Sequence, residues 1–198
     1  MDSLQIPTAS SELVHDCENC EALCCISLKL EKNKFPILSQ DKESGVPCQN
    51  LEVKDTQNLF KCRVHSQLKN NWKICAGYSC HGAGQEVSRF FGELGFSFSP
   101  DSINNKNRFL YNIQKENLEA AFVVLRELFA FLKFVKNDHG EIAYSIAKHS
   151  IEIEMEEFSL HLERTDRSMY RAERDNWFQK FLKQIAHNLQ IIGIELFA

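Results

Sequence analysis

Eight cysteines are the residues of this sequence best suited to do chemistry, and none follows Cys80. They are Cys17, Cys20, Cys24, Cys25, Cys48, Cys62, Cys75 and Cys80. Thiols gathered so densely are paired in disulfides, bound to soft metal ions or left as reactive groups. Two residues separate Cys17 from Cys20, a spacing that lets both sulfurs approach one zinc ion at about 2.3 Å. We therefore predict that the eight cysteines are metal ligands.

The spacing leaves the division of these thiols open. Eight sulfurs form two four-thiolate sites, or one four-sulfur site plus four cysteines held otherwise. Adjacent side chains of an extended segment point to opposite sides, so we expect one of Cys24 and Cys25 to join Cys17 and Cys20. The other then faces a second site or makes a hydrogen bond. His65 is a weaker ligand candidate, because a lone histidine more often donates a hydrogen bond to a thiolate or carbonyl.

Zinc is the expected metal, and a 4Fe-4S cluster is the alternative cofactor. Four-thiolate zinc is usually structural and holds together a segment that cannot fold alone. The same ligands on an iron cluster would support electron transfer or metal handling.

Composition and charge narrow the function classes. The 198 residues are 43% hydrophobic and 25% charged, with a formal net charge of −4. Lysine and arginine are spread among acidic residues, so no basic stripe predicts a nucleic-acid partner. The apolar stretch 120–135 is broken by Arg126, Glu127 and Lys133 and predicts an amphipathic helix, not a membrane span.

The N-terminal residues 1–11 show no basic start and no apolar run of the kind a secretory signal needs. We expect a cytoplasmic protein, although delivery by a secretion system that reads another signal stays open. A reducing compartment disfavours disulfides and favours metal.

The sequence pattern changes near residue 84. Residues 15–84 are rich in turns, whereas apolar residues recur at three and four positions in the remainder. We predict helices over 85–94, 108–136, 141–164 and 166–197, with a loop over 97–107 and a break over 137–140. The fold class is therefore mainly α: an irregular cysteine-rich metal-bound module, residues 1–84, followed by an antiparallel helical bundle, residues 85–198.

The apolar positions of the long helices form the expected core. They are Leu118, Ala121, Phe122, Leu125, Leu128, Phe129, Leu132 and Val135, then Ile142, Ile146, Ile151, Met155, Phe158 and Leu162, then Trp177, Phe181, Ile185, Leu189 and Ile192. The acidic residues of 152–157 predict a solvated face. If Phe131 and Phe134 lie opposite Phe129, they would form an apolar patch for a partner.

Several motifs carry a resemblance to a known family. They are Cys17-x2-Cys20-x2-Leu23-Cys24-Cys25, Asp41-Lys42, Gly45-x-Pro47-Cys48-x-Asn50-Leu51, Phe60-x-Cys62-x-Val64-His65 and Cys75-x2-Tyr78-x-Cys80-x-Gly82-Ala83-Gly84-Gln85. Together they resemble the cysteine-rich module at the start of many bacterial pentapeptide-repeat proteins, itself similar to the CxxCxxCC family of zinc- or iron-chelating proteins. The resemblance implies a bacterial metal-binding protein with the eight cysteines as ligands, and it supplies no reaction. No run of pentapeptide repeats follows the predicted helices.

Catalysis is not expected, and no catalytic residue is assigned. The sequence contains no nucleophile elbow, HExxH motif or dinucleotide fingerprint, and an all-cysteine zinc site leaves no open position for a substrate. A thiol-disulfide enzyme built on Cys17 and Cys20 lacks the usual βαβ context. We expect a binding or scaffold unit whose helical part contacts a protein partner or a second copy of the chain.

Overall fold

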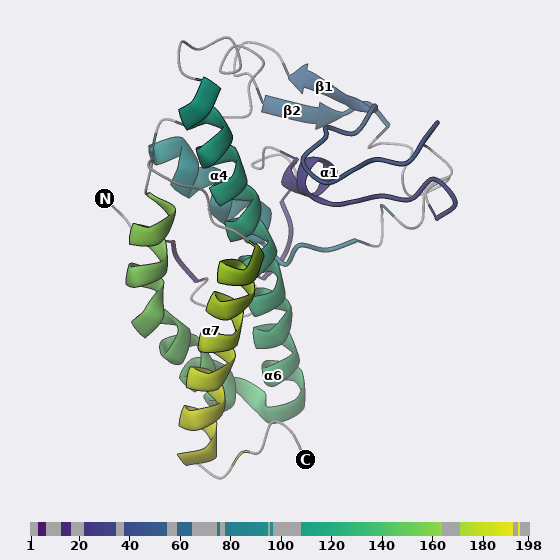
Figure 1. The fold of residues 1–198 in the computed structure, drawn as a ribbon. Coiled ribbons are helices and arrows are strands. Elements are labelled where there is room, and N and C mark those ends of the chain that lie inside the picture. The colour runs from purple at the N-terminus through teal and green to yellow at the C-terminus, as the bar shows by residue number, and fades with distance from the viewer. Residues whose placement is uncertain are drawn as a thin grey trace.

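The computed structural model describes residues 4–6, 13–16, 22–34, 38–54, 59–64, 75, 78–94, 96, 108–163, 171–191 and 194. Its elements in chain order are α1 (Leu23–Ser27), β1 (Leu51–Lys54), β2 (Leu59–Cys62), α4 (Ala83–Glu93), α6 (Arg108–Leu162) and α7 (Arg171–Ile191) (Figure 1). Long helices dominate, and the strands form a single antiparallel pair in the described residues. The predicted mainly α class is confirmed.

The long helix α6 consists of two halves that meet at Gly140. The backbone there is not helical, with φ 82° and ψ −175°, a conformation that is open almost only to glycine. The chain reverses at this point, so the second half runs back along the first (Figure 1). Asn117 in the first half donates a 3.3 Å hydrogen bond to the carbonyl of Leu162 in the second. A break between the two predicted helices is confirmed, but it is confined to Gly140, since residues 137–139 are helical.

Helix α7 completes the antiparallel bundle against the second half of α6 (Figure 1). The rings of Phe158 and Trp177 lie 5.2 Å apart, and those of Phe158 and Phe181 lie 5.6 Å apart. Lys180 forms ion pairs with Glu154 at 2.6 Å and Glu157 at 2.8 Å. The acidic run of the second half is therefore a surface face, as predicted.

Most of the apolar residues that were predicted to form the core of the long helices are buried. Every predicted core position in the first half of α6 is buried, as are Phe181, Ile185 and Leu189 of α7. Ile142 was predicted to be in the core, and this is wrong, because its side chain is 76% exposed. Ala143 and Ala147 occupy the core-facing positions instead. Ile142 precedes Ala143 by one residue, so its side chain leaves the helix about 100° away.

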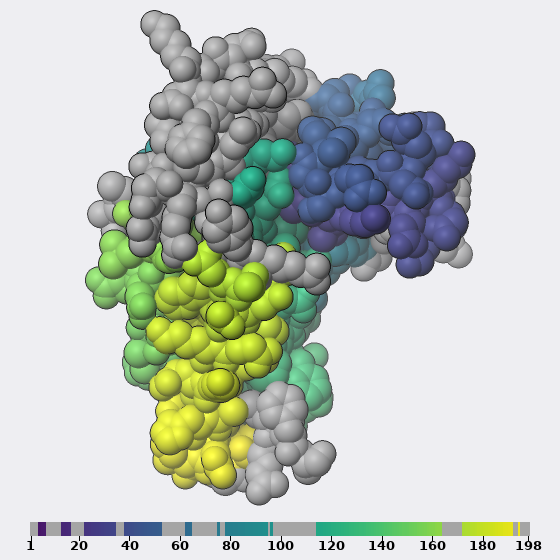
Figure 2. Space-filling view, in the orientation of Figure 1, coloured from purple at the N-terminus to yellow at the C-terminus, as the bar shows by residue number. Residues whose placement is uncertain are grey.

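The cysteine-rich part lies beside this bundle. Figure 2 shows the segments that follow residue 20, coloured purple to blue, as a lobe next to the column of helices. It contains α1 and the β1–β2 hairpin, in which Leu51 pairs with Cys62 and Lys54 with Leu59. Cys24 and Cys25 lie in the helix α1, so the extended segment expected there is wrong. No described helix is long and apolar enough to cross a membrane.

We predict that Gly140→Ala lowers the free energy of unfolding by about 1–3 kcal/mol, because alanine is strained at this φ and ψ. Urea unfolding followed by circular dichroism at the helical band measures the change. Gly92→Ala is the matched control. Gly92 lies inside α4, a Cβ there would meet nothing within 4 Å, and alanine should stabilise by about 0.5–1 kcal/mol. Equal effects of the two substitutions would contradict the assigned reversal.

Candidate metal centre

Helix α1 holds two of the candidate ligands in a fixed place. Leu23 and Ile26 have no exposed surface and belong to the hydrophobic core that α6 also lines. Residues three apart share one face of a helix, so burying Leu23 and Ile26 fixes the rotation of α1 about its axis. Cys24 and Cys25 are half-buried, and their sulfurs lie 3.9 Å apart.

The end of α1 is closed by a distant segment of the chain. The last carbonyls of a helix have no partners within it and need other donors. The amide of Gly45 donates to the carbonyl of Ile26 at 2.9 Å, and the Ser44 hydroxyl donates to that of Ser27 at 2.5 Å. The amide of Cys48 donates to the carbonyl of Cys25 at 3.0 Å. Closing the helix therefore brings Cys48 beside Cys25.

The buried side chain of Lys42 donates further hydrogen bonds to carbonyls at the end of α1. Only 5% of the residue is exposed. Its Nζ atom donates to the carbonyls of Ile26 at 2.8 Å, Leu28 at 2.5 Å and Glu43 at 3.0 Å. These three bonds use all three protons of the ammonium group, which also complements the negative end of the α1 dipole. A buried cation thus lies at the helix end that carries Cys25.

The β1–β2 hairpin adds a third cysteine to this place. The amide of Leu51 donates to the carbonyl of Cys48 at 2.9 Å, and Leu51 pairs with Cys62 across the hairpin. The side-chain amide of Asn50 lies 3.9 Å from the Cys48 sulfur, as a donor to that sulfur. Backbone bonds therefore connect Cys25 to Cys48 and Cys48 to the strand beside Cys62.

The pKa shifts of Cys25, Cys62 and Cys75 each include a contribution from neighbouring thiols. The hydrogen bond from Cys24 lowers the pKa of Cys25, burial opposes this, and the charge of Lys42 adds to it. Burial raises the pKa of Cys62, and Cys25 and Cys48 contribute to the rise. Burial raises the pKa of Cys75 to about 11, with further contributions from Cys25, Cys48 and Cys62. Thiolates that repel one another are stabilised by a shared cation.

Cys24 and Cys80 both lie against the hydrophobic core. Cys80 is buried in the hydrophobic core, and Cys24 packs against the same core. Burial raises the pKa of Tyr78 to about 12. The charges of the Cys24 and Cys80 thiols add to this rise, and Arg126 opposes it. Gly82, the residue before α4, has φ 92°, and the amide of Ala83 donates to the carbonyl of Cys80 at 2.9 Å. A tight turn therefore follows Cys80.

The N-terminal segment is tied to the start of α4. The amide of Asp16 donates to the side-chain oxygen of Gln85 at 3.0 Å, and the side-chain amide of Gln85 donates back to the carbonyl of Val14 at 2.9 Å. His15 lies 3.4 Å from the hydroxyl of Ser79. The residues before Cys17 are thus held beside the residues around Cys80.

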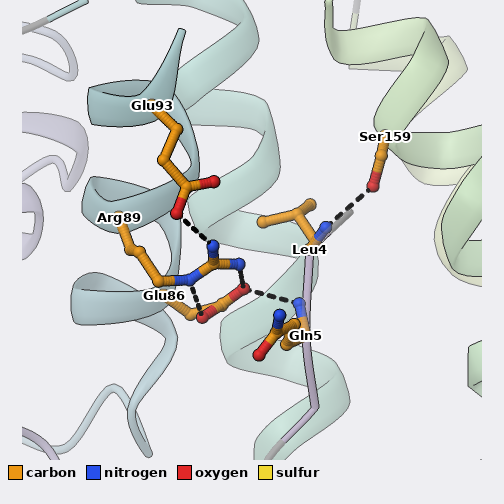
Figure 3. Close-up of polar contacts among 6 residues, drawn as sticks. All are labelled: Leu4, Gln5, Glu86, Arg89, Glu93 and Ser159. Carbon is orange, nitrogen blue, oxygen red and sulfur yellow. Dashed lines mark hydrogen bonds and ion pairs between the residues drawn. The ribbon is translucent and has the colours of Figure 1, made fainter. Parts of the chain in front are cut away.

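Residues 4 and 5, closer to the N-terminus, make a second set of contacts with the helices (Figure 3). The amide of Leu4 donates to the Ser159 hydroxyl at 3.0 Å, and that of Gln5 donates to Glu86 at 2.5 Å. Arg89 pairs with Glu86 at 2.7 Å and with Glu93 at 2.6 Å. The segment therefore joins α4 to the second half of α6.

The structure thus groups the described ligand candidates without forming a complete cage. Backbone bonds bring together Cys25, Cys48 and Cys62, Cys75 interacts with all three, and Cys24 and Cys80 lie toward the core. Cys17, Cys20 and His65 are outside the described residues. No disulfide joins the six described cysteines. Within the described part of the chain, no three Cys, His, Asp or Glu side chains lie close enough to hold a metal ion. The soft thiol donors fit zinc or an iron-sulfur cluster.

Lys42 is the residue of this region that the sequence did not reveal. A single lysine in a polar, turn-rich segment has no periodicity, and two of its partner carbonyls, those of Ile26 and Leu28, lie 16 and 14 residues away in sequence. The one available signal is its place in the Asp41-Lys42 motif.

The chain is similar to the uncharacterized protein YybG of Bacillus subtilis (strain 168). The two are 35% identical over 95 residues, which cover 47% of this chain and 32% of YybG. The chain therefore spans about a third of the length of this relative. No protein-family model and no solved structure matches the chain.

We predict that Lys42→Met lowers the free energy of unfolding by about 1–3 kcal/mol, because it removes the hydrogen bonds that Lys42 donates to the carbonyls of Ile26, Leu28 and Glu43. Urea unfolding of the full chain measures the loss. Lys29→Met is the control, since Lys29 is exposed and forms a surface ion pair with Glu43 at 3.1 Å; such pairs contribute about 0–1 kcal/mol. Equal losses would show that Lys42 acts only as a surface charge.

A buried carboxylate of α6 lies against the same segment. The Glu119 side chain is 19% exposed, and its Oε1 atom lies 3.9 Å from Nζ of Lys115, which donates to the carbonyl of Gly45 at 2.8 Å. Burial raises the pKa of Glu119, with Lys115 and Lys42 opposing the rise and Glu116 adding to it. A raised folded-state pKa stabilises the fold at low pH, and this contribution is lost as the pH rises through that pKa.

We therefore predict that Glu119→Gln removes one pH-dependent contribution to stability. The unfolding free energy of the natural chain should fall relative to that of the variant as the pH rises above about 4.3, the usual glutamate pKa. Urea unfolding of both proteins across this range measures the difference. Glu152→Gln, at an exposed position, is the control. A constant difference between Glu119→Gln and the natural chain would contradict a raised pKa.

Proposed function

We propose that this chain is a bacterial zinc-binding protein in which structural four-thiolate sites hold the cysteine-rich segments in shape, and that it acts as a binding or scaffold module. One observation carries the proposal. Backbone hydrogen bonds that close α1 bring Cys25, Cys48 and the strand beside Cys62 to one place next to the buried Lys42. The resemblance to the CxxCxxCC family agrees with metal binding.

The separation of two sulfurs also favours metal over a disulfide. A disulfide holds its sulfurs at about 2.05 Å. Two thiolates on one tetrahedral zinc ion, each about 2.3 Å away, are about 3.8 Å apart. The sulfurs of Cys24 and Cys25 are 3.9 Å apart, close to this second value. They can therefore lie at a metal centre or at the boundary of two.

Residues 28–64 bury too few apolar side chains of their own to stabilise their fold. Among the described side chains of residues 28–64, Leu38 is the one fully buried apolar side chain. So little apolar burial does not offset the entropy of ordering these turns. Metal binding would offset that cost, as it does in small zinc modules.

The helical part would present the partner surface. Phe134 and Ile142 flank the reversal at Gly140 and are 47% and 76% exposed. Phe131 is half-buried against the core, and its ring lies 6.2 Å from that of Phe134. The predicted partner is another protein or a second copy of the chain.

Elemental analysis and an absorption spectrum test the proposal, on protein purified without oxygen or chelator. We expect about two zinc ions per chain and no visible absorption. Iron with acid-labile sulfide and absorption near about 400 nm would replace zinc with the iron-sulfur alternative. Protein that is free of metal would overturn both.

We predict that Cys25→Ser lowers the metal content and unfolds the cysteine-rich segments, while α6 and α7 keep most of their helicity. Metal analysis, limited proteolysis and circular dichroism measure these three properties. Val46→Ser changes an exposed residue of the same segment and should leave all three unchanged. An unaltered metal-to-protein ratio in Cys25→Ser would remove Cys25 from the ligand set.

A further inference from the structure

The second half of α6 carries a line of exposed apolar side chains on its outer side. Ile142, Ile153 and Leu160 are 76%, 54% and 59% exposed. Successive residues of a helix point about 100° apart and rise about 1.5 Å each. At their spacing along the chain, these three side chains point within about 20° of one another over a length of about 27 Å. We call this line the outer stripe.

The rest of the molecule packs on the other sides of this helix. Ile151 points about 180° away from the outer stripe and has no exposed surface. On one flank, the Ser159 hydroxyl accepts a hydrogen bond from the amide of Leu4. On the other flank, Glu157 pairs with Lys180 of α7 at 2.8 Å. Within the described part of the chain, the outer stripe is therefore the side that the core, the N-terminal segment and α7 leave exposed.

Acidic side chains border the outer stripe. Residues 141–163 contain six glutamates and one lysine. By their helical directions, Glu152 and Glu156 lie on one side of the stripe and Glu157 lies on the other, and all three are exposed. The surface is therefore an apolar line between two acidic edges.

The neighbouring cations do not cancel this negative charge. Lys148 pairs with Glu152 at 2.8 Å, and His149 lies 3.6 Å from the same carboxylate. Lys136 and Lys180 pair with other glutamates of the segment. Six glutamates against three lysines leave the surface with a net negative charge.

This charge selects the kind of partner. In a symmetric dimer of this chain the same patch would contact its own copy, so acidic edges would meet acidic edges. Like charges placed across an interface oppose association, whereas opposite charges steer and align the partners. A helix with an apolar face and basic edges matches both the apolar line and the glutamates.

We propose that the outer stripe binds a basic amphipathic helix of a protein partner. The inference rests on the binding role proposed above, and it names the chemistry of the partner. A partner helix of about 18 residues matches the length of the stripe. Its apolar side chains pack on Ile142, Ile153 and Leu160, and its lysine or arginine side chains face Glu156 and Glu157.

Two synthetic peptides test the proposal on the full chain. Both have about 18 residues, the length that spans the stripe, with leucine along one face of the helix. The remaining positions are lysine in the basic peptide and glutamate in the acidic peptide. Titration calorimetry should show binding of the basic peptide at least about tenfold tighter than that of the acidic peptide, and weaker binding as the salt concentration rises.

Variants of the stripe locate the binding site. Ile153→Ser with Leu160→Ser removes two apolar contacts and should weaken binding of the basic peptide about tenfold or more. Glu156→Gln with Glu157→Gln should weaken it by a smaller factor and reduce its dependence on salt. Ile191→Ser is the matched control, because Ile191 is 71% exposed but lies in α7, and it should bind as the natural chain does. Circular dichroism checks that each variant stays folded.

The remaining outcomes would overturn the proposal. Absence of binding, equal binding of both peptides, or equal loss in Ile191→Ser would exclude a basic helix on the outer stripe. Analytical ultracentrifugation that shows a natural dimer and a monomeric Ile153→Ser/Leu160→Ser variant would make a second copy of the chain the occupant instead.

Zinc analysis of the same samples separates this proposal from the metal centre. The stripe lies in the bundle, so the Ile153→Ser/Leu160→Ser variant should keep the zinc content of the natural chain. A zinc-loaded chain that binds no basic peptide would overturn the partner alone. A metal-free chain that binds the basic peptide would overturn the zinc sites alone.

Discussion

The closure of α1 is the interaction on which the arrangement of the cysteine-rich part depends. A helix of five residues has almost no internal hydrogen bonds, so it persists because other groups bind its carbonyls. Segment 42–48 provides them through Lys42, Ser44, Gly45 and Cys48. The same bonds that stabilise the helix also determine which cysteine lies beside Cys25. Local structure and ligand placement therefore have one physical cause.

The first half of α6 packs against this arrangement. Lys115 and Glu119 lie against Gly45, and Arg126, two to three helical turns further on, lies near Tyr78. One helix thus contacts segment 42–48, which closes α1, and also lies near Tyr78. The ion-pairing residues that interrupt the apolar stretch 120–135 are consistent with this role, because a helix that contacts polar loops needs charged side chains there.

The helices could be predicted because their apolar residues repeat with the period of a helix, and the reversal could be predicted because Gly140 follows three polar residues. Ile142 was misplaced because periodicity alone does not show where a helix begins after such a reversal. The candidate ligands could be named from their spacing. Their grouping could not, because it depends on bonds such as Cys48 to Cys25 between residues far apart in sequence. Helix α1 and the role of Lys42 were missed for the same reason.

The tie between Leu4 and Ser159 spans 155 residues, and this separation affects how the chain matures. During synthesis the thiols leave the ribosome before α6, whose Lys115 and Glu119 contact their segment. At about 5–20 residues per second, this interval lasts seconds. During this interval the cysteines are reactive groups without the helix that packs against them. Leu4, Ile6 and Leu13 are likewise exposed until the helices that bury them have been made. Early capture of metal would protect the nascent thiols from oxidation until the bundle forms.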